Sequence, residues 1–126
     1  MVVIDTSSWI EMLRSEGRAD IRERVNAHLR AGEACSVPMV RLELWNGARG
    51  EREKRALRDL EDALPELELT ADVWDEAFEL ARRARSAGLT APASDILIAA
   101  CARHYGASID AVDNHFMELL RLVSGA

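Results

Sequence analysis

Short apolar runs alternate along this chain with longer segments of helical periodicity, and that alternation limits its fold more than any other feature. The runs are brief and rich in β-branched residues, as in strands buried inside a parallel sheet. They predict strands at 2–4, 34–37, 67–69 and 107–112. The intervening segments predict helices at 8–14, 19–31, 39–49, 51–64, 96–102 and 115–122, and a long one capped by Thr70 or Asp72 and ending near 87. Strands separated by helices indicate an α/β fold with a parallel sheet covered on both faces.

The length and composition predict a single domain spanning 1–126. Apolar residues make up 48% of the chain and charged residues 30%, the balance of an ordinary folded protein. No segment approaches the run of about eighteen apolar residues that a membrane span needs, and the first residues lack the basic start of a secretory signal. Cys35 and Cys101 lie in apolar surroundings. We therefore expect two reduced, buried thiols in a cytoplasmic protein.

Four acidic residues stand where the predicted elements begin or end. Asp5 and Asp113 follow the first and last strands, and ligands of open α/β sheets bind at the carboxyl ends of strands. Glu43 lies on a helix with large apolar residues around most of its circumference, and Asp95 opens the apolar helix. Four carboxylates brought together would repel one another without a cation. The set therefore predicts a Mg²⁺ or Mn²⁺ site that activates water against a phosphodiester.

Each of the four acids also has a structural explanation when it is taken alone. Asp5 is a suitable helix N-cap, and Asp113 suits a turn. Glu43 could be neutralised by an arginine, and the helix dipole favours Asp95 in a first turn. The prediction of a metal site therefore depends on all four acids meeting at one place.

The net charge of −6 argues against a protein that coats nucleic acid through a basic surface. Setting aside the four clustered carboxylates reduces the net charge from −6 to −2, and bound divalent cations would reduce the repulsion further. The charge is therefore compatible with a metal-dependent nuclease.

The acids lie in four ordered motifs that resemble those of PIN-domain nucleases. The motifs are Val3-Ile4-Asp5-Thr6-Ser7, Leu42-Glu43-Leu44-x-x-Gly47-Ala48, Ser94-Asp95-Ile96-Leu97-Ile98-Ala99-Ala100 and Asp113-x-x-Phe116. They follow the family's order and spacing from residue 2 to residue 116, and the size of the chain most resembles the VapC toxins of bacterial toxin–antitoxin pairs. The resemblance implies a PIN-like three-layer fold with a sheet of about four to five strands. It also implies a Mg²⁺- or Mn²⁺-dependent endoribonuclease with Asp5, Glu43, Asp95 and Asp113 as catalytic residues.

The resemblance further assigns the metal to Asp5, Asp95 and Asp113, with Glu43 as an additional candidate. One departure concerns the last motif, where the family often has Thr or Ser two residues before the fourth acid and this chain has Ala111. Asp110 beside it is a candidate for an extra metal ligand, with surface exposure as the alternative.

Two further residues of the motifs, Ser7 and His115, are candidates for positioning water, metal or substrate. Both lie close in sequence to one of the acids: Ser7 follows the first acid by two residues, and His115 follows the fourth by two.

Three partners follow from the resemblance: an RNA substrate, a second copy of the chain and a small antitoxin whose C-terminal segment crosses the acidic groove, often with an arginine at the carboxylates. No membrane partner is expected. Large apolar residues near the site belong either to the core or to a partner-binding groove: Trp9, Met12, Leu13, Leu44 and Trp45. Arginines that could contact RNA phosphates, or simply lie on solvated helix faces, are Arg14, Arg41, Arg49, Arg82, Arg83 and Arg85.

Other functions fit the sequence less well. A phosphatase with an aspartyl nucleophile needs a second aspartate two residues after the first, where this chain has Ser7, and a downstream lysine. A receiver domain needs a lysine beyond its last strands, and the chain has none after Lys54. A catalytically weak PIN-like module that binds RNA or a partner stays open because of Ala111. So does a housekeeping nuclease, which the absence of a neighbouring antitoxin gene would favour.

Overall fold

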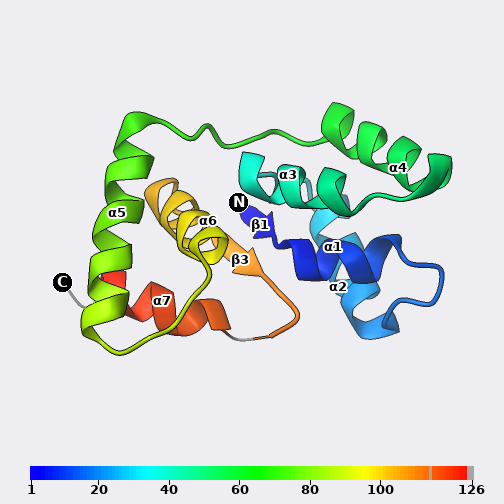
Figure 1. Cartoon of the computed structure of the whole chain (residues 1–126). Coiled ribbons are helices and arrows are strands. Elements are labelled where there is room, and N and C mark those ends of the chain that lie inside the picture. The colour runs from blue at the N-terminus through cyan, green and yellow to red at the C-terminus, as the bar shows by residue number, and fades with distance from the viewer. Residues whose placement is uncertain (114, 125–126) are drawn as a thin grey trace.

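The computed structural model describes residues 1–113 and 115–124 and confirms the predicted alternation of strands and helices (Figure 1). In chain order the elements are β1 (Val2–Ile4), α1 (Thr6–Leu13), α2 (Ala19–Arg30), β2 (Ala34–Cys35), α3 (Pro38–Gly47), α4 (Gly50–Ala63), α5 (Ala71–Ser86), α6 (Ala93–His104), β3 (Ser108–Asp110) and α7 (His115–Ser124). None of the helices described is long and apolar enough to cross a membrane. The α/β prediction is confirmed.

The sheet is parallel and has the strand order β2-β1-β3, so β1 is central. Val3 and Ile4 of β1 are fully buried, as a strand covered on both faces requires. The strand predicted at 67–69 is reduced to one parallel bridge between Ser36 and Glu66 beside β2. The backbone N–H of Ser36 donates to the carbonyl of Pro65, and its carbonyl accepts from the N–H of Leu67. The carbonyl of Glu68 accepts from the hydroxyl of Tyr105 at 2.6 Å and not from a strand. The part of the sheet that the structure describes therefore has three strands plus one bridge.

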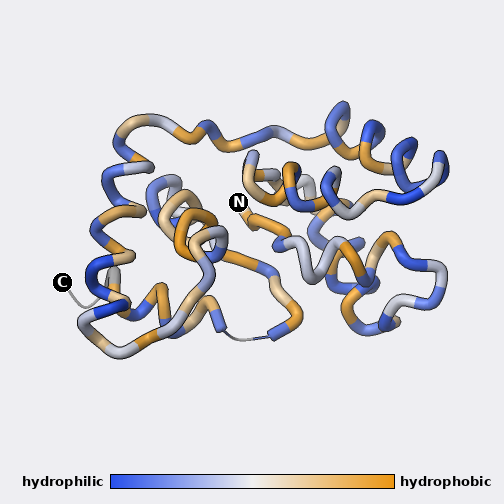
Figure 2. Tube along the Cα trace, in the orientation of Figure 1, coloured by the Kyte–Doolittle hydropathy of each residue, from blue (hydrophilic) through white to orange (hydrophobic). Residues whose placement is uncertain are grey.

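Helix α6 runs through the core, as its apolar sequence predicts. Six consecutive residues from Leu97 to Ala102 are buried, and three of them are alanine. Such small side chains let α5 and α7 pack closely against α6, and the three helices lie together on one side of the molecule (Figure 1). Strand β1 is apolar along its length (Figure 2), and its three residues belong to the same core, with Ile109 of β3 packed against it. Because α6 begins at Ala93, Asp95 lies in its first turn, as expected.

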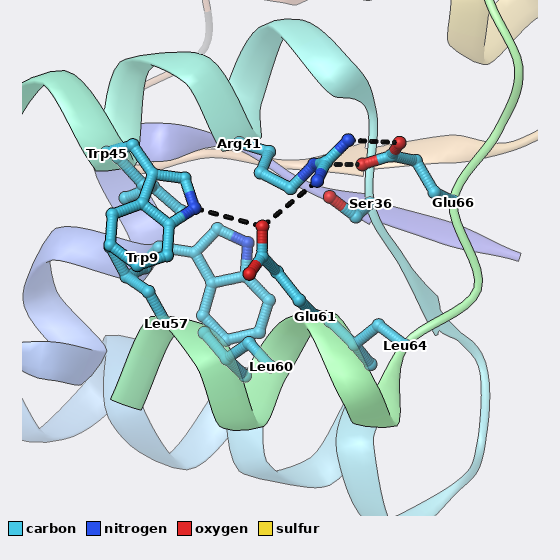
Figure 3. Close-up of a pocket in the computed structure, with 10 residues that line it drawn as sticks. Trp9, Ser36, Arg41, Trp45, Leu57, Leu60, Glu61, Leu64 and Glu66 are labelled. Atoms are coloured by element: carbon cyan, nitrogen blue, oxygen red, sulfur yellow. Dashed lines mark hydrogen bonds and ion pairs between the residues drawn. The ribbon is translucent and has the colours of Figure 1, made fainter. Parts of the chain in front are cut away.

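Helix α4 is fastened to α3 by a polar clamp on Arg41. The guanidinium of Arg41 lies 3.0 Å from Glu61 of α4 and 2.7 Å from Glu66, and the indole N–H of Trp45 donates to Glu61 at 2.9 Å (Figure 3). Beneath the clamp is a cavity of about 130 Å³ lined by leucines of α4 and by Trp9. The clamp holds α4 in place as the outer wall of a hollow beside the acidic residues described below.

Candidate active site

Asp5 lies just beyond β1 and caps helix α1. Its Oδ2 accepts from the backbone N–H of Ser7 at 3.2 Å and from the hydroxyl of Ser7 at 2.6 Å. The backbone N–H of Asp5 donates to the carbonyl of Asp110 at 2.8 Å, which ties the end of β1 to the end of β3. The carboxylate of Asp5 is therefore fixed in direction, with only 5% of the residue exposed.

Glu43 on α3 is half-buried, and its Oε1 accepts from the hydroxyl of Thr6 at 2.9 Å. Among the described residues no arginine or lysine pairs with it, so its explanation as one half of a salt bridge is wrong. Burial is the largest influence and raises the pKa of Glu43, while the Thr6 hydrogen bond opposes the shift. The negative charges of Asp5 and Asp95 raise this pKa further. Glu43 is thus close enough to both acids to feel their repulsion.

Asp95 joins the same group from α6. Burial raises its pKa, the nearby His115 opposes the shift, and the charges of Asp5 and Asp113 add to it. The Nε2 of His115 lies 3.1 Å from Asp95, and its Nδ1 lies 3.4 Å from Asp113. Asp113 itself is 72% exposed at its side chain. Since β3 ends at Asp110 rather than at 112, Asp113 stands in the turn before α7 and not at the strand end.

Two hollows flank these acids. The Glu43 hollow, of about 220 Å³, lies between α1, α3 and α4 and combines Thr6 and Glu43 with apolar side chains such as Ile10, Leu13 and Leu44. The Asp95 hollow, of about 270 Å³, is lined by Asp95, Asp113, His115 and the segment 89–92. The acids therefore stand between two open depressions, where an extended ligand could lie across them.

The group of acids has the chemistry of a divalent-cation site. Within the described residues, no arginine or lysine forms an ion pair with Asp5, Glu43, Asp95 or Asp113, and oxygen donors of this kind suit Mg²⁺ and Mn²⁺. In the arrangement seen, no three acid, histidine or cysteine side chains of the described residues converge on one ion position. Each carboxylate is instead held by Ser7, Thr6 or His115. Burial is the main cause of the raised pKa values of Glu43 and Asp95, and the mutual repulsion that adds to it is what a bound cation would relieve.

Asp110 lies in an ion pair at the end of β3 and not on the surface. Its side chain is 3% exposed, so the prediction of surface exposure is wrong. The guanidinium of Arg24 on α2 donates to both of its oxygens, at 2.7 and 2.8 Å. The hydroxyl of Ser8 donates to it at 2.8 Å, and Nε2 of His28 lies 3.1 Å from it. Burial raises the pKa of Asp110, but the hydrogen bonds from Arg24 and Ser8 outweigh it and lower the pKa overall. Asp110 is thus paired with Arg24, Ser8 and His28, apart from the group formed by the other acids.

Two polar residues near the acids were not singled out from the sequence. Thr6 follows Asp5 directly and looks like an ordinary helix-capping hydroxyl, yet its Oγ1 holds Glu43. Arg24 looks like one of many solvated arginines on an amphipathic helix. Arg24 follows Ile21 by three residues and precedes Val25, and both of these are buried. This spacing places Arg24 at the edge of the inward face of α2, and it is the signal in the sequence that could have identified it.

The whole chain resembles known proteins. Residues 2–120 match the PIN domain family. Ribonuclease VapC11 from Mycobacterium tuberculosis is 32% identical, with 98% of this chain and 95% of the relative covered. Among solved structures, VapBC2 from Rickettsia felis bound to a promoter DNA fragment is similar with a TM-score of 0.76 at 15% identity, covering 94% of this chain and 92% of that one. The Sarcin-Ricin loop cleaving toxin VapC20 from Mycobacterium tuberculosis is similar with a TM-score of 0.71 at 22% identity, covering 94% of each chain.

Proposed function

The chain belongs to the PIN-domain family, among the VapC ribonucleases, and from that premise we propose that it is a metal-dependent endoribonuclease acting as the toxin of a toxin–antitoxin pair. One observation carries the proposal: Asp5, Glu43, Asp95 and Asp113 influence one another electrostatically between two hollows, without an arginine or lysine partner among the described residues. We assign this activity to the chain as a single unit over 1–126 and place it in the cytoplasm. Its substrate is a structured RNA.

Each side chain has a part in this proposal. Asp5, Asp95 and Asp113 would hold Mg²⁺ or Mn²⁺, which when bound lowers the pKa of a water and stabilises charge on the phosphodiester. Ser7 fixes the direction of the Asp5 carboxylate. Glu43, with its raised pKa, is suited to exchange a proton with the attacking water or the leaving oxygen. These assignments are supported by the positions of the acids in the family's motifs and by the influence of Asp5 and Asp113 on Asp95.

His115 has a separate place in the proposal. It touches both Asp95 and Asp113 and is 40% exposed, so it orients these acids and is accessible to substrate.

The proposed activity is tested on purified protein with transfer RNA and ribosomal RNA as substrates. We expect cleavage in millimolar Mn²⁺ or Mg²⁺ and none in EDTA, because the acids repel one another and cannot activate water without the cation. Restoring Mn²⁺ after EDTA should restore cleavage. Equal cleavage in EDTA would contradict the metal mechanism. Tight RNA binding without cleavage in any metal would favour the module that only binds RNA.

An antitoxin is the second proposed partner, and the Glu43 hollow is the place proposed for it. Ile10 is 45% exposed there, and Leu13 and Leu44 extend the apolar lining. Glu43 and Glu53 supply two negative charges against the single positive charge of Arg14. This combination suits an amphipathic segment that carries an arginine or lysine. The solved neighbour VapBC2 is itself a toxin–antitoxin complex. The proposal fails if the product of an adjacent small gene neither binds this protein nor relieves growth arrest caused by its expression.

A homodimer is the third proposed association, and the face around Trp74 on α5 supports it. Trp74 is 41% exposed and Phe78 52% exposed, with their ring centroids 6.1 Å apart. Together with Met39, Ala93 and Leu97 they line an almost wholly apolar hollow of about 370 Å³. An apolar face of this kind on a small protein is typical of a subunit interface, and a second copy offers the same face in return. We define these five residues as the Trp74 face.

Phe78→Glu is expected to convert a dimer to a monomer at micromolar concentration, because it places a charge at the centre of the Trp74 face. We expect dimer affinity to fall by at least about tenfold, as for a central interface residue. Met117→Glu is the matched control, since Met117 is 50% exposed on α7 and does not line this hollow. Light scattering coupled to gel filtration measures the masses. A wild-type monomer, or equal effects of both substitutions, would exclude this face as the interface.

A further inference from the structure

An ion pair between the buried carboxylate of Asp110 and the partly exposed guanidinium of Arg24 joins three elements beneath the proposed active site. The carboxylate of Asp110 at the end of β3 is gripped by Arg24 of α2 through Nε at 2.7 Å and Nη2 at 2.8 Å. The hydroxyl of Ser8 on α1 donates to the same carboxylate at 2.8 Å. Two parallel hydrogen bonds between an arginine and a carboxylate fix direction as well as distance. This contact therefore sets the relative positions of α1, α2 and the end of β3.

The same arginine also holds the backbone that leads to Asp113. Nη2 of Arg24 donates to the carbonyl of Ala111 at 3.1 Å. The next N–H, of Val112, donates to the hydroxyl of Ser7 at 3.2 Å. That hydroxyl in turn donates to Asp5 at 2.6 Å. Polar contacts thus connect α2 with Asp5 through the segment 110–112. Asp113 is the next residue after this segment, so its position depends on the same contacts.

We infer that Arg24, through Asp110 and the carbonyl of Ala111, is a positioning residue that fixes the distance between Asp5 and Asp113. The inference rests on the proposed nuclease function, since it assigns these two acids to one site. Ala111 has no polar side chain with which to anchor the turn, so the anchor has to come from elsewhere. Stability alone is a weak reason for this ion pair, because the side chain of Arg24 is 43% exposed and ion pairs that reach the solvent add little to the stability of a fold.

Arg24→Met tests the inference, with Arg24→Lys as the conservative variant. Methionine keeps the apolar stem but removes all three hydrogen bonds from Arg24. The segment 110–113 then loses its charged anchor and keeps weaker contacts, such as those of Ser8 with Asp110 and of Val112 with Ser7. We expect kcat for RNA cleavage to fall about 10- to 100-fold, with a higher Mn²⁺ concentration for half-maximal activity and a KM for RNA close to that of the wild type. Lysine keeps the charge but not the bidentate contact, and should recover part of kcat. Arg18→Met is the matched control, because Arg18 forms an exposed pair with Asp20 at the start of the same helix.

A second readout does not depend on cleavage. Hydrogen exchange at the amide of Val112 should be faster in Arg24→Met than in the wild type, while the amides of α6 keep their protection. Calorimetric titration should show weaker Mn²⁺ binding by the variant. A folded Arg24→Met protein with wild-type kcat, Mn²⁺ dependence and Val112 exchange would overturn the inference. So would a variant in which every amide exchanges faster in proportion, because that pattern indicates a purely structural role.

The remaining outcomes are also distinguishable. If Arg24→Met does not fold, Ser8→Ala removes one hydrogen bond to Asp110 and keeps the ion pair. It should lower kcat and speed exchange at Val112 in the same direction, and unchanged values would overturn the inference. If the wild type cleaves no RNA in any metal, the proposed function fails. The Val112 exchange and Mn²⁺ titrations then still decide whether Arg24 positions the acids.

Discussion

Asp95→Asn is expected to reduce metal-dependent RNA cleavage by at least about 100-fold while the protein stays folded. Loss of a residue that merely supports a metal ligand already costs about 10- to 100-fold, so loss of a proposed ligand should cost no less. Asparagine has nearly the same shape and still offers an oxygen to His115, which lies 3.1 Å from Asp95. The change therefore removes the charge and little else. Single-turnover cleavage in saturating Mn²⁺ measures the effect.

The same substitution should leave the metal-free protein as stable as the wild type, or more stable. Asp95 raises the pKa of Glu43, and burial together with Asp5 and Asp113 raises that of Asp95. A carboxyl whose pKa is raised in the folded state binds protons more tightly there than in the unfolded chain. Its contribution to stability is therefore lost as the pH rises through the interval between the two pKa values. Asp95→Asn has no carboxyl at this position, so it does not lose this stability as the pH rises.

Thermal unfolding of the metal-free proteins at acidic and neutral pH tests that contrast. The wild type should lose more stability than Asp95→Asn as the pH rises, and added Mn²⁺ should stabilise the wild type far more than the variant. Asp20→Asn, at an exposed position of α2, is the control for loss of an acid elsewhere. Undiminished cleavage by folded Asp95→Asn would remove Asp95 from the catalytic residues. A strong loss of metal-free stability would show instead that its charge supports the fold.

Local signals in the sequence predicted most of the helices and the places of Asp5 and Asp95 at the starts of their helices. Asp5 follows a β-branched run and precedes hydroxyl residues, a combination that marks a strand ending in a helix cap. Asp95 precedes a segment with no polar face, which predicts a helix inside the core. The first turn of that helix, with Asp95, therefore lies next to the core as well. Gly50, the first residue of α4, has a positive φ of 73°, a conformation that glycine adopts without strain and that ends the helical path of α3 before α4 begins. These features depend on neighbours within a few residues.

Contacts between distant segments could not be predicted in the same way. Asp110 and Arg24 are 86 residues apart, and neither position is unusual by itself. The sequence left Asp110 as either a metal ligand or a surface residue, since burial beside an arginine depends on how α2 packs against β3. The strand predicted at 67–69 does not form, for a related reason. Its pairing partner was a single residue, Ser36, and a strand forms only where the neighbouring backbone runs alongside it.

Large apolar residues near the site presented the same difficulty, because core and groove positions have similar sequences. Trp9 is 1% exposed and belongs to the core, whereas Leu13 and Leu44 line the Glu43 hollow. Both kinds of residue repeat at helical spacing on α1 and α3. Only the packing of α4 separates the two groups, and α4 contributes the buried Leu57 to both the cavity beside Trp9 and the Glu43 hollow.

Trp9→Ala is accordingly expected to destabilise the protein by about 3–5 kcal/mol, the cost of removing a large aromatic side chain from a packed core. Trp9 lies on α1 one turn after Asp5 and lines the cavity beneath the Arg41 clamp, which alanine would enlarge. A domain of this size has a total stability of about 5–15 kcal/mol, so a large part of it would be lost. Trp9→Phe should restore part of the loss, because phenylalanine fills most of the same space.

Urea unfolding followed by circular dichroism measures the change, with Trp74→Ala as the matched control. Both substitutions are made in the Phe78→Glu background, so that loss of the proposed dimer contributes to neither. Trp74 is 41% exposed, and its removal should cost less than about 1 kcal/mol. The slope of the transition should stay the same for both variants if only packing is lost. Equal losses of stability in the two variants would mean that Trp9 is not part of the core. The other interpretation of the sequence, in which Trp9 belongs to a partner-binding groove, would then hold.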